Sequence, residues 1–148
     1  MTKSILNILR VLIIGALAIC CVSAQIQPVA IANIPFAFVV ADHEMPAGNY
    51  TVSFDHHELY ILLRGEGKGT AAFALTKATK NLKPSPQGKL VFKRYGDRYF
   101  LSQIWAAGNP RGRALQASRL EREEAMNKTQ PTLVSLVMAP PGLPNAAR

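Results

Sequence analysis

The middle of the chain carries a Gly96-Asp97 pair between two runs rich in apolar and aromatic residues, 89–95 and 98–105. A Gly-Asp pair flanked in this way is typical of a two-residue β-hairpin, because glycine readily adopts the positive φ that such turns need. We therefore expect two adjacent antiparallel strands here, and the rest of the fold must accommodate them.

A turn at these two residues also predicts the register of the hairpin. Directly opposed residues share a face of the sheet, and side chains along one strand alternate between faces. The predicted pairs are Tyr95–Arg98, Arg94–Tyr99, Lys93–Phe100 and Phe92–Leu101. One face is then expected to carry Leu90, Phe92, Arg94, Tyr99, Leu101 and Trp105, and the other Val91, Lys93, Tyr95, Arg98, Phe100 and Ile104. Both faces are partly apolar, so we expect another sheet, a helix or a second chain to cover each of them.

The end of this hairpin combines cations with aromatic rings, because three of the predicted pairs place an Arg or Lys beside a Tyr or Phe. Such contacts are worth roughly 0.5–1 kcal/mol each at exposed sites. One interpretation is an interaction tip for an anionic or sugar-like partner, formed by Lys93, Arg94, Tyr95, Arg98 and Tyr99. The alternative is a solvated hairpin end in which the Arg and Lys stems cover the rings.

The first residues have the three parts of a secretory signal peptide. Lys3 and Arg10 form a positive segment, residues 11–22 are apolar, and Val22-Ser23-Ala24 fits the small-x-small cleavage pattern. The apolar run of about twelve residues is shorter than the roughly 20 that a spanning helix needs. We predict a signal peptide over residues 1–24, cleavage after Ala24, and a periplasmic or secreted protein.

Both cysteines, Cys20 and Cys21, lie within this leader, so the mature chain is expected to contain no disulfide and no thiol ligand. A lipoprotein signal would need a small residue before the modified cysteine, whereas Ile19 precedes Cys20. Removing the leader takes away two cations and no acid, which changes the formal charge from +8 to about +6. For an exported protein, the expected partners are an anionic envelope polymer or another protein, not nucleic acid.

Short strand-like segments with turns between them predict a mainly β fold. The predicted strands are 29–40, 49–54, 59–63, 70–78, the two hairpin strands and 132–138. Ser118 and Glu121 form a capping-box pattern, which predicts a short helix from residue 119 to about 127. We expect an antiparallel β-sandwich or small β-barrel of about seven strands, with this one helix in the C-terminal half. One domain would span residues 25–139, and the proline-rich tail 140–148 is expected to be disordered.

Three stretches together resemble a known bacterial family. They are Ile34-Pro35-Phe36-Ala37-Phe38, Pro46-Ala47-Gly48-Asn49-Tyr50-Thr51-Val52, and the 91–105 hairpin that continues to Ser118-Arg119-Leu120-Glu121-Arg122-Glu123. The chain is similar to small, uncharacterised, signal-peptide-bearing proteins common in soil acidobacteria. Members usually carry an acidic residue where this chain has Ala37. The resemblance implies an exported, mostly β protein, and it implies no activity, cofactor or catalytic residue.

Asp55-His56-His57-Glu58 is the clearest candidate for a metal site, with His43 and Asp42 as further ligands. The two segments flank one predicted strand, which would hold them about 20 Å apart. The chain contains no Gly-x-Ser-x-Gly nucleophile motif, and its glycine-rich segment 64–69 lacks the Gly-Lys-Ser/Thr ending of a phosphate loop. We therefore predict no catalytic, cofactor or metal site.

Two functions fit these observations. The first is an exported, non-enzymatic binding or interaction domain that acts at the cell envelope through the basic aromatic tip. The alternative is a carrier of a small apolar ligand, with a cavity inside a barrel lined by Phe36, Phe38, Phe92 and Trp105. An enzyme of unknown type is a third possibility.

Overall fold

The computed structural model describes residues 28–55, 58–67, 69–80, 84–127 and 130–141, so the predicted leader lies outside the described residues. Within them the chain is mainly β, with ten strands and one helix. The strands are β1 (Pro28–Ile34), β2 (Phe38–Val40), β3 (His43–Met45), β4 (Gly48–Phe54), β5 (Tyr60–Gly65), β6 (Ala71–Lys80), β7 (Gly88–Tyr95), β8 (Arg98–Trp105), β9 (Arg111–Leu115) and β10 (Thr132–Met138), and the helix is α2 (Arg119–Asn127). The predicted mainly β class is confirmed.

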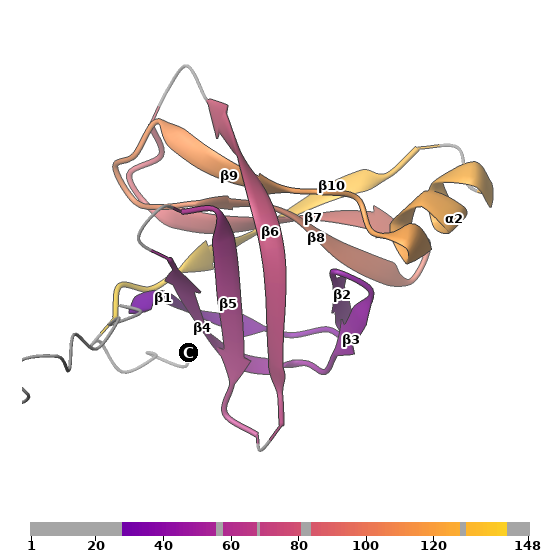
Figure 1. The fold of residues 1–148 in the computed structure, drawn as a ribbon, viewed down its shortest axis with the longest axis horizontal. Helices are drawn as coiled ribbons and strands as arrows, with labels where there is room; N and C mark the ends of the chain where they lie inside the picture. The colour runs from indigo at the N-terminus through magenta and orange to yellow at the C-terminus, as the bar shows by residue number, and fades with distance from the viewer. Residues whose placement is uncertain (1–27, 56–57, 68, 81–83, 128–129, 142–148) are drawn as a thin grey trace, which may run out of the picture.

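All the strands belong to one hydrogen-bonded sheet with the order β1-β4-β5-β6-β9-β8-β2-β3, and β7 joins β8 to β10. Strand β6 holds the sheet together because its first half pairs with β5 and its second half, from Thr76, pairs with β9. In Figure 1, β5 and β6 stand upright while β7, β8 and β9 run across the view behind β6. The sheet therefore folds over into two crossed layers, as in a sandwich.

The core lies between these layers and is built from alternating inward side chains, as period-two strands require. Ile61 and Leu63 of β5 and Val52 of β4 are fully buried from one layer. Leu90 and Phe92 of β7 are fully buried from the other. The small residues of β6 also point inward, and Ala72 and Ala74 are buried in the same cluster. The small side chains of β6 thus belong to the same core cluster as the larger residues of β5 and β7.

The hairpin of β7 and β8 confirms the predicted register near its turn, with the four predicted pairs all present. The register then shifts between Val91 and Phe92, so that Val91 lies opposite Gln103 and Leu90 lies opposite Ile104. Because of this bulge, the residues of β8 beyond it point to the opposite faces from those predicted. Ile104 joins the core between the layers and Trp105 lies on the other face, so our prediction for these two residues was wrong.

The expected number of about seven strands was too low, because three short strands carry little sequence signal. The predicted first strand is interrupted at Pro35, which separates β1 from β2. Strand β2 turns through Ala41 and Asp42 into β3, and it also pairs in parallel with β8 at Tyr99 and Phe100. Strand β9 was not predicted.

The sheet is not closed into a barrel. Two of its edge strands approach each other where β1 meets the end of β10, and Ile31 and Ala139 exchange two backbone hydrogen bonds of 2.9 and 2.8 Å. The next antiparallel pair would be Asn33 and Val137, but no ladder continues there within the described residues. We call this junction the seam.

Helix α2 spans the predicted residues, and the backbone N–H of Glu121 donates to Ser118 Oγ at 3.1 Å, as a helix cap. The reciprocal half of the capping box is replaced, because the Glu121 side chain accepts from Lys93 instead. Arg119 and Glu123, four residues apart on the helix, form an ion pair of 3.0 Å, whereas Lys128, four residues after Glu124, lies outside the described residues. No helix in the described part of the chain is long and apolar enough to cross a membrane.

Candidate functional site

The structure brings the predicted tip residues together at the β7–β8 turn, but α2 covers part of them. Lys93 Nζ lies 2.8 Å from Glu121 Oε1, and the Glu121 side chain is only 6% exposed. Leu120 of the helix packs against a small cluster formed by Val39, Tyr95 and Phe100. Lys93 and Tyr95 therefore help to attach the helix to the hairpin.

Arg98 is also engaged by acids. Its guanidinium lies 3.0 Å from Glu44 of β3 and 3.1 Å from Glu124 of α2. The hydrogen bond with Glu124 is the main cause of a raised pKa for Arg98, and Glu44 adds to it. Arg98 thus joins β8, β3 and α2, and much of its charge is balanced within the molecule.

Arg94 and Tyr99 form the more accessible part of the tip. The Arg94 side chain is 45% exposed, its Nε donates to the Gly96 carbonyl at 2.6 Å, and its guanidinium is 3.7 Å from the exposed Asp97. It also lies 5.4 Å from the centre of the Tyr99 ring. Tyr99 in turn stacks on Phe36 with ring centres 3.8 Å apart. Of the predicted tip cations, Arg94 is the one with the least buried ion pair.

The four aromatic residues of the predicted carrier cavity do not surround one space. Phe36 and Phe38 both pack edge-to-face against Phe92, with ring centres 5.3 and 5.6 Å apart. Trp105 lies on the opposite face of the hairpin, where it covers Gly112. These rings fill the protein interior instead of lining a cavity.

The segment that we considered and rejected as a metal site is only partly described, since His56 and His57 lie outside the described residues. Its last member, Glu58, forms an ion pair with Arg113 of β9, whose Nε donates to the carboxylate at 3.0 Å. Asp42 caps α2 by accepting from the Leu120 N–H at 3.0 Å. No group of three or more His, Cys, Asp or Glu side chains suited to a metal ion occurs among the residues that the structure describes.

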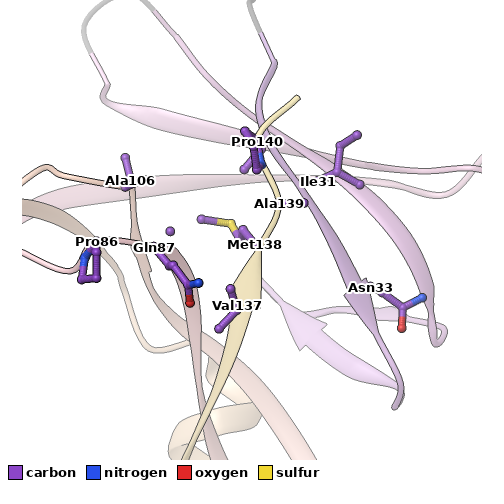
Figure 2. A pocket seen from close by; sticks show the side chains of 12 residues that line it. Ile31, Asn33, Pro86, Gln87, Ala106, Val137, Met138, Ala139 and Pro140 are labelled. Carbon is purple, nitrogen blue, oxygen red and sulfur yellow. The ribbon is translucent and has the colours of Figure 1, made fainter. Parts of the chain in front are cut away.

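A pocket of about 490 Å³ surrounds the end of β10 at the seam, and we call it the seam pocket. Figure 2 shows Ile31 and Asn33 of β1 on one side of this strand, and Pro86, Gln87 and Ala106 on the other. Its lining is Ala30, Ile31, Asn33, Pro86, Gln87, Gly88, Ala106, Ala107, Val137, Met138, Ala139 and Pro140. The pocket exists because β1 and β10 pair at a single bridge and then separate.

The lining of the seam pocket determines what it can do chemically. Most of it is apolar, and the two amides of Asn33 and Gln87 are its polar side chains. None of the lining residues carries a carboxylate, imidazole, thiol or amine. Pockets of roughly 300–1,000 Å³ with apolar walls and a few polar groups are the usual form of small-molecule sites. The seam pocket is therefore equipped to hold an apolar group and orient it by hydrogen bonds.

Sequence reasoning missed this pocket because its residues come from four separate segments and carry no motif. Small residues such as Ala106 and Ala107, and the prolines on both sides of it, were the available signals. They could not be combined without knowing that β1 and β10 meet.

Comparisons with protein-family models, with curated proteins and with solved structures each found no match.

Proposed function

We propose that this protein is an exported, non-enzymatic binding domain that acts at the cell envelope and holds an apolar ligand in the seam pocket. The observation that carries the proposal is the pocket itself, with its volume of about 490 Å³ and its apolar walls. The amides of Asn33 and Gln87, one on each side of β10 (Figure 2), offer direction-specific hydrogen bonds, and Asn33 Nδ2 also donates to Asn49 Oδ1 at 2.7 Å. The leader-like N-terminus supports export.

This proposal moves the binding site of the carrier hypothesis from the interior of the β-domain to its seam. The inward aromatic rings pack against each other, whereas the seam leaves space beside a buried methionine, Met138. Methionine adapts its shape to different apolar partners. A flexible apolar chain, such as an acyl chain, suits this site better than a rigid polar molecule.

The experiment is a thermal-unfolding screen of the purified protein with medium-chain fatty acids, linear alcohols and apolar tripeptides. A ligand present at about 100 times its Kd stabilises the folded state by about 2.7 kcal/mol, which is a measurable rise in Tm. Ala106→Phe should fill part of the pocket and abolish the rise. Ala37→Phe is the matched control, because Ala37 is exposed and does not line the pocket.

The proposal fails if no compound of these classes raises Tm, or if Ala106→Phe responds as the parent does. An equal loss of response in the Ala37→Phe control would also count against it, since a remote substitution should leave the pocket intact.

A second candidate retains the hairpin tip as a contact for an anionic envelope polymer. It is favoured by the half-exposed guanidinium of Arg94 above the Tyr99 ring. Binding of the parent to isolated envelope fractions should weaken as salt rises, because exposed charges are screened. Arg94→Ala should reduce this retention, while Lys80→Ala, at an exposed position on β6, should not. If retention changes neither with salt concentration nor with the Arg94→Ala substitution, the hairpin tip is not the contact for the envelope polymer.

A further inference from the structure

The outer face of β5 and β6 carries a contiguous group of apolar side chains, which we call the outer patch. Leu75 is 66% exposed and Phe73 52%. Tyr60 lies opposite Leu75, and Leu62 lies opposite Phe73. The Tyr60 and Phe73 rings touch with centres 4.5 Å apart. Solvent-exposed apolar clusters of this kind usually mark an interaction surface.

Cations lie at both ends of the outer patch. Alternation along the strands places Arg64 of β5 and Lys77 of β6 on the same face as the apolar group. Both side chains are exposed, and neither forms an ion pair within the described part of the chain. An apolar centre with free positive charges at its ends matches the surface of an anionic lipid layer, which is apolar below charged headgroups.

A hollow of about 480 Å³ adjoins the outer patch and extends the same pattern. Phe73 and Leu75 contribute apolar side chains to its lining, and Arg119 and Arg122 of α2 contribute cations. Asp42 also lines it, but its carboxylate is occupied by the N-terminus of the helix. Arg119 is paired with Glu123, whereas Arg122 donates only to the Ser118 carbonyl, at 3.4 Å, among the described residues. The hollow thus offers an apolar wall to a lipid chain and a basic wall to its headgroup.

From these features we infer that the outer patch docks the protein on an anionic lipid surface, with Phe73 and Leu75 inserted between headgroups. Tyr60 fits the same position, since its ring is apolar and its hydroxyl can stay in the wet interface. In Figure 1, β5 and β6 stand in front of the hairpin strands, so nothing drawn there covers their outer face. This inference does not depend on the seam pocket, which lies at other residues.

The test is sedimentation of the purified protein with vesicles of phosphatidylcholine alone or with added phosphatidylglycerol. We expect binding to the mixed vesicles, and a double Phe73→Ser, Leu75→Ser variant should bind roughly tenfold more weakly or worse, because apolar burial is lost. A double Arg64→Ala, Lys77→Ala variant should lose about fivefold for each charge, on mixed vesicles only.

The matched control is a double Met126→Ser, Leu133→Ser variant. These residues of α2 and β10 are 85% and 64% exposed and line neither the seam pocket nor the hollow, so their loss should leave vesicle binding unchanged. All variants keep the same N-terminal residues, so a retained leader cannot explain a difference between them.

Three results would overturn the inference. They are absence of binding to mixed vesicles, parental binding by the Phe73→Ser, Leu75→Ser variant, and an equal loss in the Met126→Ser, Leu133→Ser control. Light scattering distinguishes lipid binding from self-association of the protein. If the parent self-associates and only the Phe73→Ser, Leu75→Ser variant does not, this face binds a second copy of the chain instead of a lipid surface. The Ala106→Phe variant should bind vesicles normally, so failure of the seam-pocket proposal is distinguishable from failure here.

Discussion

At the scale of single residues, Gly112 shows how a small residue can be required by a neighbour. Gly112 lies opposite Trp105, whose ring covers it. A Cβ added at Gly112 would lie 2.5 to 2.7 Å from three atoms of that ring. The indole ring of Trp105 is rigid and cannot move away from an added Cβ as the end of a flexible side chain could. A glycine is therefore needed at position 112 for this packing.

We expect Gly112→Ala to destabilise the protein by about 1–3 kcal/mol, the usual effect of overpacking. Urea unfolding followed by far-UV circular dichroism measures it directly, and this readout does not depend on Trp105.

The control for this prediction is the same substitution in a Trp105→Leu background, where the clash should largely disappear. If the two penalties are equal, the cost belongs to the backbone at Gly112 and the ring is not its cause.

The carboxyl group of Asp42 has a lowered pKa, below its usual value of 3.8. The main cause is the hydrogen bond from the Leu120 N–H, assisted by further contacts at the start of α2. A lowered folded-state pKa means that the stabilisation is present above the unfolded pKa and is lost as pH falls through the folded value.

Asp42→Ala should therefore lower Tm at pH 7, and the difference from the parent should shrink below pH ~4. Thermal unfolding of both proteins from pH 7 to pH ~2.5 tests this. A difference in Tm that stays constant over the whole range would contradict a role for the ionised carboxylate.

At the scale of elements, α2 is attached to the hairpin by side chains of its first two turns. Leu120 packs against Tyr95 and Phe100, Glu121 pairs with Lys93, and Glu124 pairs with Arg98. Glu121 is the most demanding of these contacts, because it buries a carboxylate that accepts a hydrogen bond from Lys93. Removing one partner of a buried ion pair destabilises the folded protein, because the other charge is left buried without a partner.

Lys93→Ala should cost about 1–3 kcal/mol of unfolding free energy, because it leaves the buried Glu121 oxygen without this donor. The double variant Lys93→Met, Glu121→Leu should recover most of that loss, since an apolar pair can replace a buried ion pair.

Chemical denaturation measures both effects, and Lys77→Ala serves as the control because that lysine is exposed. A Lys93→Ala variant as stable as this control would show that the pair contributes little to the attachment of α2.

At the scale of the whole molecule, the seam is the place where the sheet is held by the fewest bonds. Ile31 and Ala139 form one bridge, whereas β7 and β8 pair along the full hairpin. Regions with few backbone bonds open locally at a lower free energy than the core ladder does. Opening at the seam would also widen the seam pocket.

Hydrogen exchange should therefore be faster at the amides of Ile31 and Ala139 than at those of Phe92 and Leu101. Exchange measured by NMR at neutral pH, with and without a pocket ligand, tests this, and the ligand should slow exchange at the seam first. Equal protection at the seam and in the hairpin would mean that the seam opens only when the whole domain unfolds.

The sequence by itself determined the features that depend on neighbours along the chain. The Gly96-Asp97 turn and the four pairs next to it follow from local geometry, and so do the bounds of α2 and its Ser118 cap. The alternating pattern was sufficient for the mainly β class. These features are local because a turn or a cap is decided by a few adjacent dihedral angles and hydrogen bonds.

Which residues meet on each surface depends on the tertiary structure. Several features depend on contacts that the local sequence does not specify. They are the bulge that turns Trp105 away from the core between the layers, the acidic partners of Lys93 and Arg98, and the bridge between Ile31 and Ala139. The sequence of a strand does not specify which other strand it pairs with, since the backbone of any apolar strand can hydrogen-bond to that of another. The seam pocket and the outer patch arise from these long-range pairings.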